Sequence, residues 1–336
     1  MSRSGAGASR SHPPAGRAAA GDPDLSVTLG PLRLKNPVVA ASGTFGYGTE
    51  FLPYLNLSDL GGFVTKGLSL HPRAGNAPPR TCETAAGMLN AIGLANVGVD
   101  AFLSEKLPRL RGQGTAIIAN VFGETVDEYV AVAGRLNGAE GLNAIELNLS
   151  CPNTEKGGIA FGVSPPVIIE VVRAVRRAAP DLPLIVKLTP NITDIAAAGR
   201  AARDGGADIL SLVNTFLGMA VDLEARRPVL HNVVGGLSGP AIKPLALYMV
   251  HRVYREVGLP VFGMGGIASA RDALEFMVAG SSAVQIGTAN FFEPGVAARI
   301  VAEIRSWCRG DGIEAVREII GTLSVPAGGP SGACAV

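Results

Sequence analysis

The pattern that decides the fold lies in residues 184–214, LIVKLTPNITDIAAAGRAARDGGADILSLVN. Two short apolar runs, 184–188 and 208–214, flank a helical pattern over 193–204. The helical pattern ends at Asp204-Gly205-Gly206, which is a typical helix stop. Because both runs are continuously apolar rather than alternating, they indicate strands that are covered on both faces, as in a parallel sheet. The stretch therefore predicts a strand–helix–strand unit.

The same unit repeats along the chain. The candidate strands are PVVAAS (37–42), FVTK (63–66), TAIIAN (115–120), AIELN (144–148), LIVKL (184–188), DILSLVN (208–214), PVFGMG (260–265) and AVQIG (283–287). Helical patterns intervene over 125–136, 166–179, 193–204, 241–257 and 269–279. This alternation predicts an α/β fold, a (β/α)₈ TIM barrel, with a doubly wound sheet as the structural alternative. Segment 25–34 is expected to form a small hairpin that closes the bottom of the barrel.

Charge and composition restrict the class of protein. The chain has 336 residues with 29 Lys+Arg and 28 Asp+Glu, a net charge of +1. Such a balance provides no broad field for a polyanion, so nucleic acid and an anionic membrane are not expected as partners. Hydrophobic residues make up 47% of the chain, enough for one large core, which we assign to residues 25–324. We expect segment 1–24 to be a disordered tail and segment 325–336 a loose one.

The cysteines and histidines are sparse and scattered. Cysteines stand at 82, 151, 308 and 334, with no C-x-x-C pair, which is typical of a reducing, cytoplasmic compartment. No Cys, His and acid cluster has metal-ligand spacing, so we expect no metal site. No apolar run approaches the ~20 residues that span a bilayer.

Two connections are much longer than ordinary loops between strand and helix. One runs from Gly67 to about Ala101, and the other from Thr215 to Pro240. Structureless loops beyond ~12–15 residues are usually functional. Both leave the C-terminal ends of predicted strands, which is where barrels place their sites. We therefore expect long loops around a site at this face.

Polar side chains and glycines gather at the predicted strand ends. They are Ser42, Lys66, Asn120, Asn148, Lys187, Asn214, Gly265-Gly266 and Gly287-Thr288. Buried amides and amines each need a partner, so packing alone does not account for this set. The glycine loops after strands seven and eight are typical of phosphate binding on backbone N–H groups. Cys151 follows strand four in a polar, Gly-rich loop, which favours a functional thiol there.

Seven motifs resemble one known family. They are GMLNAIGLANVG (87–98), NLSCPN (148–153), VKLTPN (186–191), VNTFLG (213–218), GGLSGPAIKP (235–244), GMGGI (263–267) and IGTANF (286–291). These motifs resemble the family-1 dihydroorotate dehydrogenases and, more narrowly, the catalytic subunit of the NAD-linked type 1B enzymes. The family's quinone-linked class 2 has Ser as its base and an N-terminal membrane-binding helix, and this chain departs from that class.

The resemblance implies an activity and a set of partners. It implies that residues 25–324 form an FMN-binding barrel that oxidises (S)-dihydroorotate to orotate in de novo pyrimidine biosynthesis. Electrons would pass to NAD⁺ through a second subunit that carries FAD and a [2Fe–2S] cluster. The implied assembly is a heterotetramer of two catalytic and two electron-transfer chains.

The resemblance also implies roles for individual residues. Cys151 matches the general base. The residues that match substrate-binding positions are Lys66, Asn90, Ala91, Ile92, Gly93, Leu94, Asn148, Asn214 and Thr215. The residues that match flavin-binding positions are Ser42, Lys66, Gly67, Asn120, Asn148, Lys187, Val213, Gly239, Gly265, Gly266, Gly287 and Thr288.

Three alternatives remain open at this stage. The first is the fumarate-linked type 1A enzyme, which shares nearly all of these residues. The second is a Schiff-base aldolase barrel with Lys66 or Lys187 as the amine, which leaves Cys151 without a role. The third is a non-catalytic barrel that binds a phosphate-bearing ligand.

Overall fold

The barrel predicted from the sequence is present in the computed structural model, which describes residues 21–150, 152–153 and 159–325. Its eight parallel strands are β3 (Val38–Ala40), β4 (Gly62–Val64), β7 (Ala116–Val121), β8 (Ala144–Asn148), β11 (Leu184–Lys187), β12 (Ile209–Leu212), β17 (Val261–Met264) and β18 (Ala283–Ile286). They pair in this order, and β18 closes the ring on β3. The TIM-barrel prediction is therefore confirmed, and closure of the sheet excludes the doubly wound alternative.

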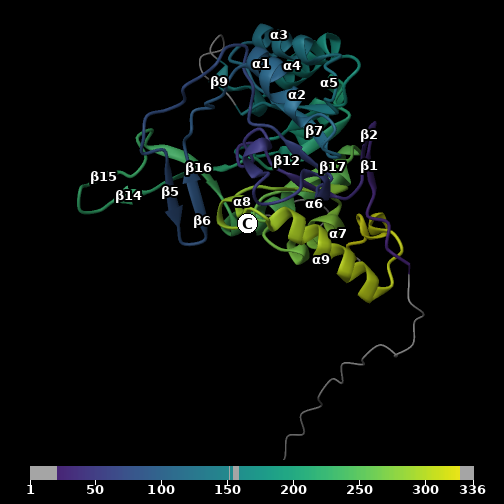
Figure 1. The fold of residues 1–336 in the computed structure, drawn as a ribbon. Helices are drawn as coiled ribbons and strands as arrows, with labels where there is room; N and C mark the ends of the chain where they lie inside the picture. The colour runs from purple at the N-terminus through teal and green to yellow at the C-terminus, as the bar shows by residue number, and fades with distance from the viewer. Residues whose placement is uncertain (1–20, 151, 154–158, 326–336) are drawn as a thin grey trace, which may run out of the picture.

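The five predicted helices are also present, with ends that shift by at most two residues. They are α3 (Val126–Leu136), α4 (Pro165–Ala178), α5 (Ile195–Gly205), α6 (Lys243–Val257) and α7 (Ala270–Ala279), and they surround the barrel (Figure 1). Local capping sets the ends of α5. The Asp194 side chain accepts hydrogen bonds from the backbone N–H groups of Ala196 and Ala197, and Gly206 ends the helix in a left-handed conformation.

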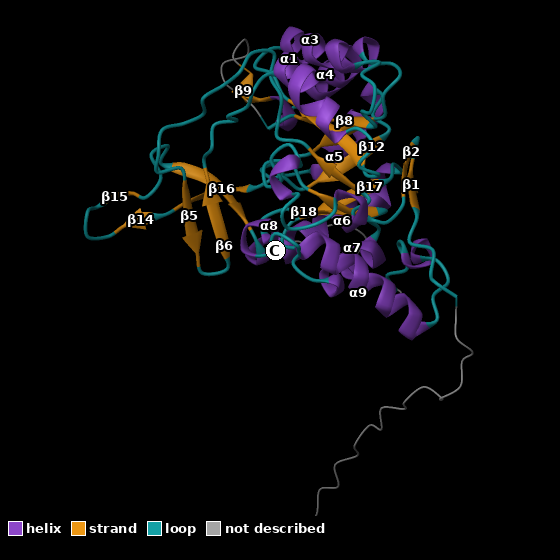
Figure 2. Ribbon diagram, viewed as in Figure 1, coloured by secondary structure: helices purple, strands orange, loops and turns teal. Residues whose placement is uncertain are grey.

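Short helical segments complete the ring, as Figure 2 shows. After β3 the chain forms two 3₁₀ turns, η1 (Thr49–Phe51) and η2 (Leu57–Asp59). The segment before β7 is α1 (Val99–Ala101), the π-helical η3 (Phe102–Lys106) and α2 (Leu107–Leu110). Three further 3₁₀ turns are η4 (Phe161–Val163), η5 (Pro240–Ile242) and η6 (Val316–Ile319). The chain continues after β18 with α8 (Ala289–Phe292) and α9 (Val296–Asp311).

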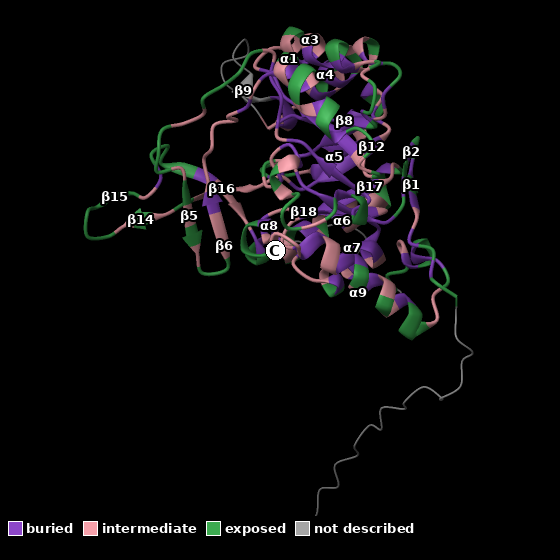
Figure 3. Ribbon diagram, in the orientation of Figure 1, coloured by how far each residue is buried: buried purple, intermediate pink, exposed green. Residues whose placement is uncertain are grey.

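The continuous apolar runs are explained by burial on both sides of the barrel wall. Every residue of β3, β4, β8, β11, β12, β17 and β18 is buried. Figure 3 shows this buried core under helices whose outer faces are exposed. Parallel strands between helices and a filled interior have no solvent-facing side, so their sequence does not alternate.

The predicted hairpin at the bottom is confirmed. Strands β1 (Val27–Leu29) and β2 (Leu32–Leu34) pair antiparallel. The turn residue Gly30 has a φ of +52°, and a Cβ added there would lie 3.4 Å from the carbonyl oxygen of Asp208. Asp208 immediately precedes β12, so the hairpin lies against the N-terminal end of the barrel.

Two residues before Leu25 contact the C-terminal part of the chain. The backbone N–H of Asp24 donates to the carbonyl of Glu314 at 2.8 Å. The Asp22 carboxylate pairs with Arg305 and Arg309 of α9. Residues 1–20 and 326–336, which hold most of the two expected tails, lie outside the described residues.

The two long connections form a small sheet that the sequence analysis did not predict. The first supplies β5 (Thr81–Thr84) and β6 (Gly87–Asn90), and the second supplies β13 (Phe216–Met219) and β16 (Val234–Ser238). The strand order is β13-β16-β6-β5, all antiparallel. This sheet projects from one side of the barrel, with the hairpin of β14 (Val221–Asp222) and β15 (Arg227–Pro228) at its far end (Figure 1).

Glycines permit the close pairing of this sheet. A Cβ added at Gly87 would lie 2.0 Å from the carbonyl oxygen of Ser238, and one at Gly236 would lie 2.1 Å from Thr215 Oγ1. Real Cβ atoms do not approach other atoms so closely, so both positions require glycine. Another short pair, β9 (Pro152–Asn153) with β10 (Ile159–Ala160), follows β8. In the described part of the chain, no helix has the length and apolar character needed to cross a membrane.

Candidate active site

One cavity of about 710 Å³ opens at the C-terminal ends of the barrel strands. Every site residue predicted from the sequence lines it, with the exception of Cys151. Cys151 lies outside the described residues. The lining residues from that set are Ser42, Lys66, Gly67, Asn90, Ala91, Ile92, Gly93, Leu94, Asn120, Asn148, Lys187, Val213, Asn214, Thr215, Gly239, Gly265, Gly266, Gly287 and Thr288.

The small sheet forms one wall of this cavity. Thr81 of β5, Met88 and Asn90 of β6, and Ser238 of β16 all face it. Asn90 Nδ2 donates to the carbonyl of Gly236 at 3.3 Å, which holds the end of β6 against β16. The long connections therefore meet over the strand ends, as the sequence analysis expected for functional loops.

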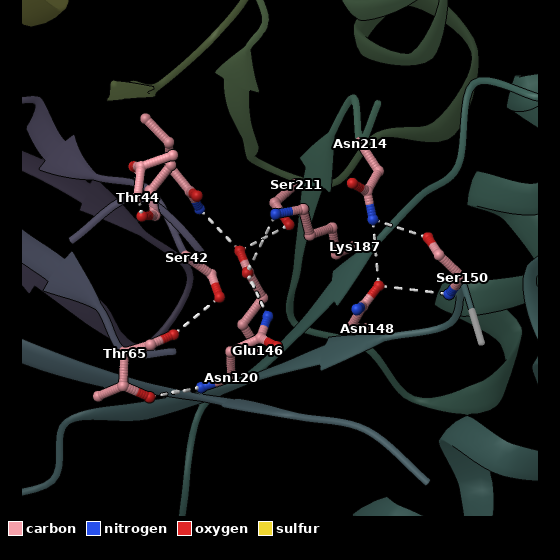
Figure 4. A network of polar contacts seen from close by, with 12 residues as sticks. Ser42, Thr44, Thr65, Asn120, Glu146, Asn148, Ser150, Lys187, Ser211 and Asn214 are labelled. Atoms are coloured by element: carbon pink, nitrogen blue, oxygen red, sulfur yellow. Dashed lines mark hydrogen bonds and ion pairs between the residues drawn. The ribbon is translucent and has the colours of Figure 1, made fainter. Parts of the chain in front are cut away.

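Amide side chains at the ends of β8 and β12 hold one another in place. Asn214 Nδ2 donates to Asn148 Oδ1 at 3.2 Å and to Ser150 Oγ at 2.7 Å (Figure 4). Asn214 Oδ1 in turn accepts from the backbone N–H of Thr215 at 2.8 Å. These contacts fix which end of each amide faces the cavity, so a ligand meets an ordered set of donors and acceptors.

A second polar group lies deeper, inside the barrel wall. Asn120 and Lys187 line the cavity, and both contact the buried carboxylate of Glu146 (Figure 4). Glu146 is not among the site residues predicted from the sequence. Its signal was present, because Glu146 is the one charged residue in the apolar run AIELN. A carboxylate there is costly unless it is paired, which argues for a specific partner.

The charges of the cavity favour an anionic ligand. Among the described residues, its charged lining side chains are Lys66, Arg80, Lys187 and Glu293. Partial burial lowers the pKa of the Lys66 ammonium from its usual value, and the positive charge of Arg80 lowers it further. Within the described ranges, no three His, Cys, Asp or Glu side chains gather as metal ligands.

Glycines shape the part of the cavity that follows β17. Gly265 and Gly266 have φ angles of +125° and +77°, which favour glycine. A Cβ added at Gly266 would lie 2.9 Å from the carbonyl oxygen of Gly239, which lines the same region. At Gly287, after β18, the nearest atom to an added Cβ is 3.9 Å away, so the backbone there is open to the cavity.

Several lining residues were not predicted. The unpredicted polar ones are Thr44, Arg80, Thr81, Ser150, Ser238 and Glu293, and the aromatic ones are Phe291 and Phe292. Arg80 and Thr81 reach the cavity only because β5 pairs beside β6. Phe291 is the last residue of the motif IGTANF and Phe292 follows it on α8, so the signal for both was present beside the predicted Gly287-Thr288 loop.

Comparison with known proteins identifies the family. The dihydroorotate dehydrogenase family matches residues 24–307. The chain belongs to this family. It is 54% identical over 303 residues to the dihydroorotate dehydrogenase B (NAD⁺) catalytic subunit of Geobacter sp. strain M21, covering 90% of this chain and 99% of that protein.

Other similar proteins carry the same description. The Geobacter sulfurreducens protein is 55% identical over 303 residues, and the Trichlorobacter lovleyi protein is 56% identical over 301. Each match covers 90% of this chain and 99% of the relative. The family match therefore spans the entire barrel of this dihydroorotate dehydrogenase family member, including every described strand end that lines the cavity.

Proposed function

We propose that the chain is the catalytic subunit of a dihydroorotate dehydrogenase, which oxidises (S)-dihydroorotate to orotate in de novo pyrimidine biosynthesis. One observation carries the proposal: a single cavity brings together the glycine loops, Lys66, Lys187 and the amides Asn148 and Asn214. The family match favours this activity over an aldolase or a non-catalytic barrel. The type B relatives favour NAD⁺ over fumarate as electron acceptor.

The cavity fits FMN in size and chemistry. Cofactor pockets measure roughly 300–1,000 Å³ and are mostly apolar with a few placed polar groups, and this cavity of about 710 Å³ agrees with that range. The exposed backbone at Gly266 and Gly287, with Thr288, offers a cradle for a phosphate. Lys187 supplies a positive charge at the inner end. When bound, FMN supplies the hydride acceptor.

Amide side chains suit the substrate. Dihydroorotate carries a carboxylate, ring carbonyls and ring N–H groups, and amides can donate to the first two and accept from the third. Asn148 and Asn214 are already oriented by their mutual hydrogen bond. Segment 90–94 adds Asn90 and a turn in which Gly93 and Leu94 have φ angles of +73° and +57°. We assign these residues to substrate binding.

Cys151 is our candidate for the general base. Oxidation removes a proton from the substrate ring as well as a hydride, so one side chain must accept that proton. Cys151 follows Ser150, whose hydroxyl accepts from Asn214 at the cavity wall. The assignment rests on the sequence motif NLSCPN.

Bound flavin provides the first test. Purified protein should show flavin absorption bands, and denaturation should release FMN rather than FAD. The reason is that the glycine loops after β17 and β18 suit a phosphate, while the sequence that follows GMGGI lacks the acidic residue of a dinucleotide-binding Rossmann motif. Absorbance spectra and chromatography of the released cofactor measure this. A colourless protein that cannot be reconstituted with FMN would end the flavin proposal.

A partner subunit completes the proposed reaction. The relatives are described as catalytic subunits of NAD⁺-linked enzymes. The chain has no cysteine cluster for an iron–sulfur centre. We propose that a second subunit carries FAD and a [2Fe–2S] cluster and passes electrons to NAD⁺, in a tetramer of two catalytic and two electron-transfer chains.

Assays of the isolated chain test whether dihydroorotate oxidation and NAD⁺ reduction take place on different subunits. The isolated chain should oxidise dihydroorotate with an artificial dye as acceptor but should not reduce NAD⁺, because NAD⁺ is bound by the partner. Steady-state assays with each acceptor measure the two rates. Efficient NAD⁺ reduction by the chain alone would contradict the proposal that a partner subunit binds NAD⁺.

We place the protein in the cytoplasm on its cysteine pattern alone. Cys82 and Cys308 are free thiols in the described part of the chain. Free thiols without disulfides are typical of a reducing compartment.

A further inference from the structure

Glu146 is a buried charge to which the proposed reaction assigns no role. It lies on β8, is 0% exposed and does not line the cavity. Burying an ionised carboxylate is strongly unfavourable unless its oxygen atoms are paired. Its partners therefore show what the residue does.

Three neutral side chains donate hydrogen bonds to this carboxylate. Asn120 Nδ2 lies 2.8 Å from Oε1. Ser211 Oγ and Gln285 Nε2 lie 2.9 Å and 2.7 Å from Oε2. They come from β7, β12 and β18, so the contacts cross the barrel interior. Every partner is a donor, which matches an ionised carboxylate rather than a carboxylic acid.

The fourth partner connects Glu146 to the cavity. Lys187 Nζ lies 3.8 Å from Glu146 Oε1, and the lysine side chain is only 8% exposed. This distance is that of an ion pair and is too long for a hydrogen bond, so the ammonium keeps its N–H groups for a ligand. The other charged side chains that line the cavity are Lys66, Arg80 and Glu293. In the described residues, the acid that pairs with Lys187 is Glu146.

Glu146 also sets the orientation of Asn120. Asn120 Nδ2 donates to Glu146, so Asn120 Oδ1 points the other way, toward Gly67. A Cβ added at Gly67 would lie 3.0 Å from Asn120 Oδ1. Both Asn120 and Gly67 line the cavity. One buried carboxylate thus orients an amide and an ammonium that meet the same ligand.

We propose that Glu146 is a positioning residue of the flavin site, which holds Lys187 and Asn120 in place and partly neutralises the positive charge that Lys187 presents to the cofactor. The inference rests on the proposed function. Two-electron reduction adds negative charge to a flavin, so Lys187 favours the reduced form and Glu146 opposes it. Glu146 therefore tunes the midpoint potential of bound FMN.

Glu146→Gln tests this in the full-length chain with FMN bound. The substitution keeps the size of the side chain and removes its charge, and its NH2 group replaces one of the two oxygen atoms that accept hydrogen bonds. We expect affinity for reduced FMN to rise about tenfold relative to oxidised FMN, a rise of about 30 mV in the two-electron midpoint potential. Redox titration followed by absorbance measures the potential, and FMN binding under oxidising and reducing conditions measures the affinity ratio.

Two further variants separate charge from packing. Ser211→Ala removes a neutral hydrogen bond to the same carboxylate and should leave the potential unchanged. Glu146→Asp keeps the charge but moves it away from Lys187, so it should produce a smaller rise and serves as the test if Glu146→Gln does not fold.

The outcomes are distinct. A purely structural role would weaken both redox forms of FMN equally, leaving the potential where it was. An unchanged or lowered potential in Glu146→Gln, or an equal rise in Ser211→Ala, overturns the inference. Failure of the wild-type chain to bind FMN would instead overturn the proposed function.

Discussion

Cys151→Ser is expected to slow reduction of the flavin by dihydroorotate by roughly 10²–10⁴-fold, the usual contribution of a positioned base. A serine hydroxyl is a much weaker base than a thiolate but has a similar size. Binding of dihydroorotate should persist, because Asn148, Asn214 and Lys66 are unchanged. Stopped-flow absorbance gives the reduction rate, and its dependence on substrate concentration gives the binding constant.

The pH dependence sharpens this test. A free thiol has a pKa of about 8.5, and only the thiolate accepts a proton. The wild-type rate should therefore rise with pH through the alkaline range, and Cys151→Ser should lose that rise. Cys82→Ser is the matched control, because Cys82 is a free thiol on β5 that does not line the cavity. A near-normal rate and unchanged pH profile in Cys151→Ser would assign the base to another residue.

Lys187→Ala has the second largest expected effect. We expect weaker FMN binding and a reduction rate lower by roughly 10²–10³-fold, the usual cost of removing one group that stabilises developing charge. The physical reason is that the Lys187 ammonium is almost fully buried at the inner end of the cavity, where water screens it little. Ultrafiltration measures FMN retention, and stopped-flow absorbance measures reduction.

The controls for Lys187→Ala must account for the Glu146 carboxylate, which loses its ion-pair partner in this variant. Lys187→Ala leaves the Glu146 carboxylate without its ammonium, so thermal unfolding is measured alongside to separate stability from function. Lys106→Ala removes a lysine from η3, outside the cavity, and should change neither FMN binding nor the rate. Wild-type reduction by Lys187→Ala would show that this ammonium is not near the flavin.

The barrel could be predicted because its signals are local. The run LIVKL and the helix stop at Asp204-Gly205-Gly206 each indicate a structure formed within a few residues, and both are present. The small sheet has no such signal. Its strands β6 and β16 come from two separate long connections, and the contact between Asn90 and Gly236 joins residues 146 positions apart. Such pairing depends on where the barrel places the two connections.

The sequence by itself determined the strand–helix order, and with it the rim on which Lys66, Asn148, Lys187 and Asn214 meet, because parallel strands in one barrel share one C-terminal face. Only the tertiary structure decided which groups contact one another. Glu146 is a single acid in an apolar strand until closure of the barrel brings Asn120, Ser211, Gln285 and Lys187 to it from four other strands. Hydrogen bonds and ion pairs act over a few ångströms, so they depend on distances that residue order alone does not contain.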